Sequence, residues 1–153
     1  MKILTKNRQA YHDYDITDTI EVGIILAWHE VKAIKEGKVN ISDAIVRVSG
    51  NQLDILNLDI PLYSKTSLRQ LWSYDPRHSR RLLMHRSELT KWIARTHRKA
   101  EVMLPLEVRM MKNYRIKILL WLAKRLRKVE KKQILKEKDL GRQMNKQIKQ
   151  AWF

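Results

Sequence analysis

Arginine and aromatic side chains gather in residues 57–85, whose sequence is NLDIPLYSKTSLRQLWSYDPRHSRRLLMH. Guanidinium groups bind phosphates and aromatic rings stack on unpaired bases, so this mixture is typical of surfaces that hold folded single-stranded RNA. The segment is also long for a connection in a compact domain, and long ordered loops are often binding loops. The alternative is a solvated loop with a few aromatic rings that face the core. The residues concerned are Tyr63, Arg69, Trp72, Tyr74, Arg77, His78, Arg80 and Arg81.

The sequence carries no motif for making or breaking bonds. It has no Gly-rich phosphate loop, no GxSxG and no HExxH, and its five His residues lie singly rather than at metal-ligand spacing. The absence of Cys excludes thiolate catalysis, disulfides and Cys-bound zinc. A lone His is more often structural than catalytic, and an acid such as Glu30 could simply pair with a neighbouring Lys or Arg. We therefore expect a binding protein rather than an enzyme, with no metal and no other cofactor.

The charge of the chain indicates a polyanionic partner. It holds 32 Lys and Arg against 16 Asp and Glu, a net charge of +16 at pH 7. Nucleic acid and an anionic membrane surface both fit such a charge. No run approaches the ~18 apolar residues of a membrane span, and the first residues lack the apolar core of a signal peptide. We expect a soluble, cytoplasmic protein.

Short β-rich runs alternate with two helical stretches, which predicts a small antiparallel barrel or half-barrel with peripheral helices. Alternating apolar and polar residues within the runs suit strands with one buried face and one wet face. The strands are expected at 19–28, 43–50, 52–60, 101–111 and 114–123, with turns at 49–52 and 112–114. One helix is expected at 29–37, ended by Gly37, and another at 85–99, capped by Ser87. The inward-facing residues of the second helix are expected to be Leu89, Trp92 and Ile93.

Several segments, taken in order, resemble the bacterial SsrA-binding protein family, also called small protein B. They are NRQAYHDYDI at 7–16, EVGIIL at 21–26, EVKAIKEGKVNISDAIVRV at 30–48, YDPRHSRRLLMH at 74–85 and PLEVRMMKNYRIKI at 105–118. Each motif is modest, but together they cover nearly the whole chain at the right separations. The resemblance implies a mainly β fold, an antiparallel β-barrel of oligonucleotide-binding type with peripheral helices and a basic C-terminal tail. It also implies an adaptor that binds transfer-messenger RNA, carries it to ribosomes stalled on messages without a stop codon, and helps its tRNA-like half into the A site.

The family's RNA-facing surface carries over to ten positions of this sequence. The implied RNA-binding residues are Asn7, Arg8, His12, Tyr14, Glu21, Glu30, Lys32, Asp75, Arg80 and Arg81. The cationic members suit phosphate contacts, whereas Tyr14 could stack on a base or be buried. Phosphates would repel Glu21 and Glu30, so these acids are expected to accept hydrogen bonds from base edges, 2′-hydroxyl groups or a neighbouring Arg.

Some positions depart from the family pattern. The family usually has Gly near the start of the EVK helix, where this chain has Trp28, and Tyr74 replaces the His of an HDP motif. After the last strand, the family usually has the sequence GKK, then an aromatic residue or His, then DKR. The matching stretch here is RLRKVEKK, in which Arg125 replaces the Gly and Val129 replaces the ring. The charge is kept, but the flexible hinge and the stacking ring are lost.

The C-terminal segment 123–153 is strongly basic, with eleven Lys or Arg and three acids. Leu140, Met144 and Ile148 recur with Trp152 at a spacing of four, on one side of a helix. A segment with this many charges cannot bury enough apolar surface to order itself. We therefore expect a tail that is disordered when free and helical inside an RNA-lined channel. The resemblance identifies this channel as the vacant mRNA path beyond the decoding centre. The alternative is a basic tether that adds only long-range attraction.

We therefore expect an RNA-binding β-barrel domain at 1–122, a tail at 123–153, and a monomer whose partners are transfer-messenger RNA and small-subunit rRNA. The implied ribosome-binding residues are Lys124, Arg125, Arg127, Lys128, Glu130, Lys131, Lys132, Leu140, Met144, Ile148, Lys149 and Trp152. The alternative function is that of a general basic RNA-binding or ribosome-associated β-barrel protein without a dedicated RNA partner.

Overall fold

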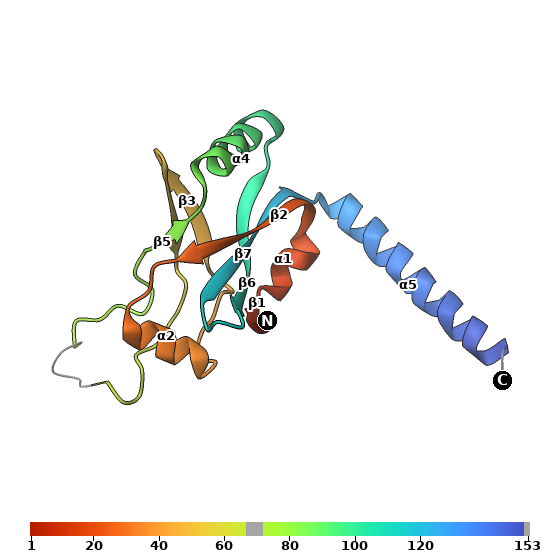
Figure 1. Ribbon diagram of the computed structural model, residues 1–153. Helices are drawn as coiled ribbons and strands as arrows, with labels where there is room; N and C mark the ends of the chain where they lie inside the picture. Colours follow the sequence, from red (N-terminus) through yellow and green to blue (C-terminus); the bar gives the residue numbers. More distant parts are fainter. Residues whose placement is uncertain (67–71, 152–153) are drawn as a thin grey trace.

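One curved antiparallel sheet forms the body of the molecule, and a long C-terminal helix projects from it (Figure 1). The computed structural model describes residues 1–66 and 72–151. The strands are β1 (Lys2–Lys6), β2 (Tyr14–Ile24), β3 (Ile45–Ser49), β4 (Gln52–Leu56), β5 (Arg80–Leu83), β6 (Val102–Met110) and β7 (Ile116–Arg125). The helices are α1 (Arg8–Asp13), α2 (Trp28–Lys35), α4 (Arg86–Lys99) and α5 (Lys128–Ala151).

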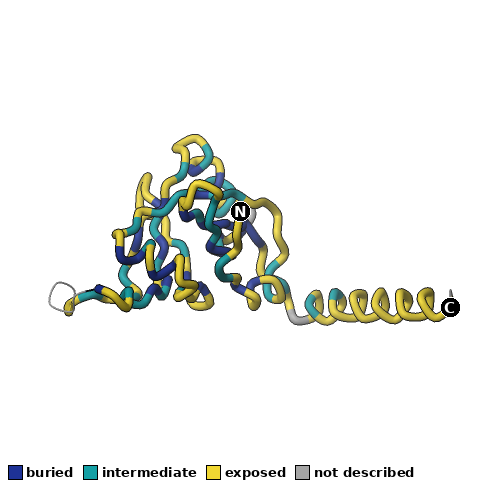
Figure 2. The backbone as a smooth tube through the Cα atoms, turned by 60° about the horizontal axis from the view of Figure 1, so that its bottom comes forward, coloured by how far each residue is buried: buried dark blue, intermediate teal, exposed yellow. Residues whose placement is uncertain are grey.

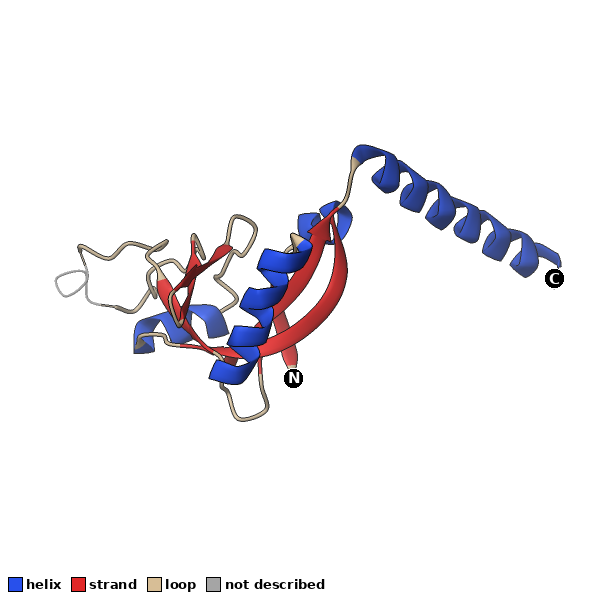
Figure 3. Ribbon diagram, turned by 90° about the horizontal axis from the view of Figure 1, so that it is seen from above, coloured by secondary structure: helices blue, strands red, loops and turns tan. Residues whose placement is uncertain are grey.

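The sheet curls without closing. Its seven strands run in the order β1-β6-β7-β2-β5-β4-β3, and every neighbouring pair is antiparallel. Among the described strands no pairing joins β1 to β3, so both are edges of the sheet. Figure 3 shows the strong curvature of the long strands and α4 lying along them. The predicted mainly β fold with peripheral helices is confirmed, with an open rather than a closed barrel.

Strand β7 is buried on both faces, which explains its nearly continuous apolar sequence. Because successive side chains of a strand point to opposite faces, Ile118 and Leu120 enter the main core while Leu119 and Trp121 enter a second cluster. Helix α4 covers the main core with Leu89 and Trp92, as predicted. Helix α1 covers the second cluster with Ala10. The sheet is therefore sandwiched between helices along its central strands, and Figure 2 shows this buried centre.

Three local features differ from the sequence-based expectations. The short elements β1, α1 and β5 were not predicted, because their few residues carry too little periodicity to be distinguished from loops. The chain leaves the sheet at Ile24, and α2 begins at Trp28, so the strand predicted at 19–28 is shorter at its end. Helix α4 is capped by His85 rather than Ser87, and no side-chain hydrogen bond forms there. Gly37 does follow α2 with a positive φ of 80°, as a helix-ending Gly should.

Strand β7 extends past residue 123, into the segment that is expected to form the tail. Strand β7 keeps its pairing to β2 as far as Arg125, and the backbone N–H of Leu126 donates to Asp13. Helix α5 then extends away from the body with nearly all of its surface exposed (Figures 1 and 2). Its apolar residues Leu140, Met144 and Ile148 are more than half exposed, and Trp152 lies outside the described residues. That this segment is disordered when free and orders on binding stays a prediction.

None of the helices in the described ranges 1–66 and 72–151 is long and apolar enough to span a membrane.

Candidate nucleic-acid interface

Helix α2 places Glu30 at the centre of a buried polar cluster. The helix buries the face that carries His29, Glu30, Ala33 and Ile34, and the Glu30 side chain is only 2% exposed. One carboxylate oxygen accepts a hydrogen bond from the backbone N–H of Ala27, at 3.0 Å. A Glu at the third helical position commonly satisfies this N–H, so the carboxylate fixes the beginning of α2.

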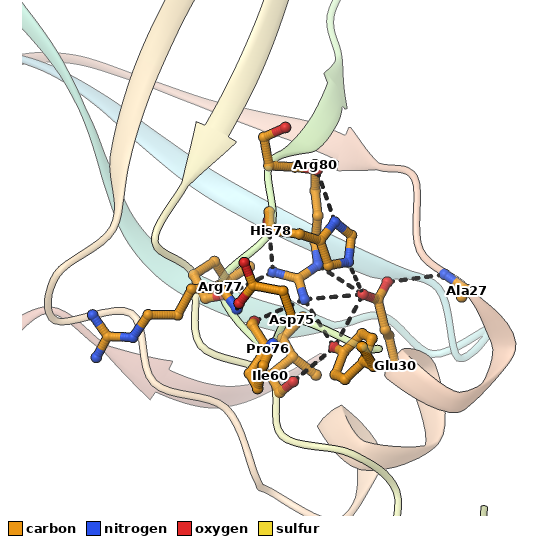
Figure 4. A network of polar contacts seen from close by, with 11 residues as sticks. Ala27, Glu30, Ile60, Asp75, Pro76, Arg77, His78 and Arg80 are labelled. Carbon is orange, nitrogen blue, oxygen red and sulfur yellow. Dashed lines mark hydrogen bonds and ion pairs between the residues drawn. The ribbon is translucent and has the colours of Figure 1, made fainter. Parts of the chain in front are cut away.

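The guanidinium of Arg80 completes the Glu30 cluster (Figure 4), and the Arg80 side chain is 0% exposed. Its Nε donates to Glu30 at 3.0 Å. Its remaining nitrogens donate to the carbonyl of Leu58 at 2.6 Å and to the hydroxyl of Tyr74 and the carbonyl of Pro76, both at 3.0 Å. These bonds use donors that a phosphate would otherwise take. In this structure the charge of Arg80 is buried and neutralised by Glu30, so Arg80 supports the 74–80 segment; that it contacts RNA phosphate stays a prediction.

The groups around Glu30 keep its carboxylate ionised. Burial alone would raise the pKa of Glu30, but hydrogen bonds from Arg80, Ala27 and His78 outweigh it and keep the pKa below the ordinary 4.5. Burial raises the pKa of the Tyr74 hydroxyl to about 12, so Tyr74 stays neutral. The cluster thus contains a fixed ion pair that ties the 74–80 segment to α2. Glu30 was expected to accept hydrogen bonds from an RNA group or from a neighbouring Arg. In this structure it accepts one from Arg80.

A second network lies on the other side of the sheet, under α1. Arg109 donates to Glu21 at 2.6 Å and to Glu107 at 2.7 Å, and the Tyr11 hydroxyl donates to Glu107 at 2.9 Å. Burial and the bond to Glu107 raise the pKa of Tyr11 to about 12. Burial opposes ionisation of Glu107, but Arg109 and Tyr11 together hold its pKa below the ordinary range. Glu21 therefore also has an Arg partner, and this network fixes α1 to strands β2 and β6.

The N-terminal positions divide into supports and exposed residues. Asn7 is buried and caps α1, its side-chain oxygen accepting the N–H of Ala10 at 3.2 Å. Tyr14 is half-buried and packs against the second cluster. Arg8 and His12 are exposed on α1. Asn7 thus has a capping role in this structure, and its contact with RNA stays a prediction.

The remaining members of the predicted surface are exposed. Lys32 lies on the open face of α2, and Arg81 lies beside Arg80 on β5 with a hydrogen bond to Gln52. Asp75 accepts the N–H of Arg77 at 3.0 Å, a bond typical of Asp before a turn. The structure therefore leaves Arg8, His12, Lys32, Asp75 and Arg81 accessible, and gives the other predicted positions supporting contacts. The sequence did not point to Arg109, Glu107 or Tyr11, because partners from distant strands leave no local motif.

The base of the tail is tied to the body at α1. The Lys131 ammonium lies 2.7 Å from the Asp13 carboxylate, and the Glu130 carboxylate accepts the backbone N–H of Arg127 at 2.9 Å. Most of the predicted tail cations are exposed: Lys124, Arg125, Arg127, Lys132 and Lys149. The Lys128 side chain lies outside the part of the chain that the structure describes.

Removing the exposed cations singly should change the salt dependence of RNA binding. In each of Arg8→Ala, Lys32→Ala and Arg81→Ala we expect the slope of log affinity against log salt to fall by about 0.7 to 0.9, the loss of one phosphate contact. Filter binding over a salt series measures this slope. Arg47→Ala serves as the control, because Arg47 is exposed on β3 and outside the predicted surface. Three slopes equal to that of the parent would remove these residues from the interface.

Comparison with known proteins adds an independent finding. A family model described as SmpB protein matches residues 4–150. An SsrA-binding protein of Persephonella marina is 38% identical over 149 residues, covering 97% of this chain and 95% of the relative. An SsrA-binding protein of Enterococcus faecalis is 32% identical over 148 residues, covering 97% of this chain and 94% of the relative. A chain from a solved structure described as "tmRNA-SmpB: a journey to the center of the bacterial ribosome" matches with a TM-score of 0.66 and 33% identity, over 88% of this chain and 95% of that chain.

Proposed function

The chain belongs to the SmpB family, and we propose that it is the RNA-binding adaptor of trans-translation. In this role it binds transfer-messenger RNA (tmRNA, also called SsrA RNA) and delivers it to stalled ribosomes, where the nascent chain is tagged and released. Its partners are tmRNA and the ribosome, and it works in the cytoplasm as a monomer. It binds and positions RNA, and catalyses no reaction itself.

The observation that carries this proposal is the extent of the match. Relatives named SsrA-binding proteins align with 97% of the chain, which includes the curved sheet, both buried networks and the tail helix. The net charge of +16 supports a polyanionic partner. The description of the similar solved structure names tmRNA, SmpB and the bacterial ribosome.

In the proposed mechanism the body and the tail have separate tasks. The two buried networks hold α1, α2 and the 74–80 segment rigid, so the exposed cations meet RNA without first being ordered. The tail leaves the body at Leu126 and presents its cations and its apolar stripe along α5. We assign tmRNA binding to residues 1–127 and ribosome engagement to residues 128–153.

A competition assay tests the proposal. Labelled tmRNA is bound to the full chain and challenged with unlabelled tmRNA, bulk tRNA or random single strands at physiological salt. We expect tmRNA to compete at least ten times better than the random strands, because a dedicated partner presents a folded shape as well as charge. Equal competition by all three RNAs would favour the general basic RNA-binding protein instead.

A further inference from the structure

The exposed face of α2 carries an aromatic ring and two cations in one line. Trp28, Lys32 and Lys35 follow each other at i, i+4 and i+7, opposite the buried face of the helix. Trp28 is 59% exposed, although Trp residues are highly buried on average. Trp28 to Lys35 covers about 10 Å of helix, comparable to about three stacked nucleotides at ~3.4 Å each.

Each of the two lysines lies over aromatic rings. The Lys32 ammonium is 6.0 Å from the centre of the Trp28 ring and 5.7 Å from that of Tyr63. The Lys35 ammonium is 5.1 Å from the centre of the Tyr114 ring, which comes from the turn between β6 and β7. Cation and ring are thus already side by side, and both are accessible to a ligand that has a flat face and a negative charge.

Tyr114 occupies a backbone conformation that disfavours its side chain. Its φ is 61°, in the left-handed region where Gly or Asn is accepted most easily and a bulky residue is an outlier. Its ring is also 67% exposed and so contributes little apolar burial to folding. A ring kept at a strained and exposed position indicates a role outside the fold.

A shallow hollow of about 340 Å³ lies beside the Tyr114 ring. Its floor is apolar and includes Leu83, which is 53% exposed, and Ile116. The polar side chains that line it belong to Tyr114, Arg115 and Lys117, and the described lining contains no acid. A base fits such an apolar floor, and its phosphate fits the cationic rim.

We propose that the open face of α2 and the β6–β7 turn form a stacking platform for unpaired bases of the bound RNA. Trp28 and Tyr114 stack on the bases, while Lys32, Lys35 and Arg115 contact the adjoining phosphates. The platform rests on the proposed function, because it takes tmRNA as the RNA concerned.

Ring-removing variants separate stacking from charge and from folding. In Trp28→Ala and Tyr114→Gly we expect tmRNA affinity to fall by about 5- to 100-fold each, the loss of one stacked base, with an unchanged salt slope because the rings are neutral. The thermal midpoint of Tyr114→Gly should equal or exceed that of the parent, because Gly relieves the positive φ. Trp28→Phe keeps a ring and should recover most of the lost affinity.

Trp28 fluorescence reports the contact directly. The difference in emission between the parent and Trp28→Phe isolates Trp28 from the other four Trp residues. A short single-stranded RNA should quench this difference, and a blunt duplex of the same sequence should not, because its bases are already stacked on one another. The platform is wrong if both ring-removing variants bind tmRNA as tightly as the parent and the Trp28 emission is not quenched. If the parent still prefers tmRNA in that case, the adaptor role stands. If the parent itself does not prefer tmRNA, the proposed function fails first.

Discussion

Removal of residues 128–153 is expected to abolish peptide tagging on stalled ribosomes while leaving most tmRNA binding. The cut follows Arg127 because β7 is paired as far as Arg125 and the N–H of Leu126 donates to Asp13, so the body keeps its backbone contacts. The truncated protein loses eight Lys or Arg and three acids, so its non-specific attraction to RNA falls modestly. Tagging is measured in a purified translation system and binding is measured in parallel. Tagging at the parental level would show that the tail has no part in ribosome engagement.

A point variant distinguishes a helical tail from an electrostatic tether. Lys146→Pro removes a backbone donor inside α5 and disfavours the helix by roughly 3 kcal/mol. Lys146→Ala removes the same charge and keeps the helix, so it is the matched control. We expect both variants to bind tmRNA alike, and only the Pro variant to lose tagging. A Pro variant that tags as well as the Ala variant would leave the tether as the explanation.

Arg80→Ala is expected to lower the free energy of unfolding by about 3 to 5 kcal/mol, because it leaves Glu30 charged and buried without its partner. The carbonyls of Leu58 and Pro76 lose their donors at the same time. Arg81→Ala is the matched control. Arg81 is the next residue along β5 and its side chain is exposed, so the free energy of unfolding should change by no more than about 0.5 kcal/mol. Urea denaturation at pH 7 measures both variants. Similar losses in the two would contradict the assignment of Arg80 to the buried cluster.

Acid titration gives a second readout of the same cluster. The pKa of Glu30 is lowered on folding, so its contribution to stability is fully present above its ordinary pKa of 4.5 and is lost as the pH falls further. Glu30→Gln removes this titration, so its stability should fall less steeply than that of the parent below pH 4.5. The lowered pKa values of Glu107 and Asp13 act in the same direction and remain in both proteins.

The sequence predicted the long strands well and the short ones poorly. Strands β6 and β7 have enough residues for their apolar pattern to stand out, whereas β5 has four. Missing β5 also concealed the difference between Arg80 and Arg81. Along β5 buried and exposed side chains alternate, so two adjacent Arg residues face opposite ways.

The supporting contacts of the site were beyond the reach of the sequence. The acceptors of Arg80 include the backbone carbonyls of Leu58 and Pro76, and any residue type supplies a carbonyl. Glu30 was expected to accept from an RNA group or from an Arg, and only the fold shows that Arg80 lies beside it. Trp28 was recognised as a departure from the family pattern, but its exposure and the pairing of its ring with Lys32 depend on the placement of α2.

Tagging of a stalled chain is the most direct test of the adaptor role. A message without a stop codon is translated by purified ribosomes and factors with alanyl-charged tmRNA, with and without this protein. We predict that the nascent chain acquires the tmRNA-encoded peptide only when the protein is present, with a yield that rises until protein and tmRNA are equimolar. Tagging that proceeds equally without the protein, or no tagging although the protein has bound tmRNA, would contradict the adaptor role.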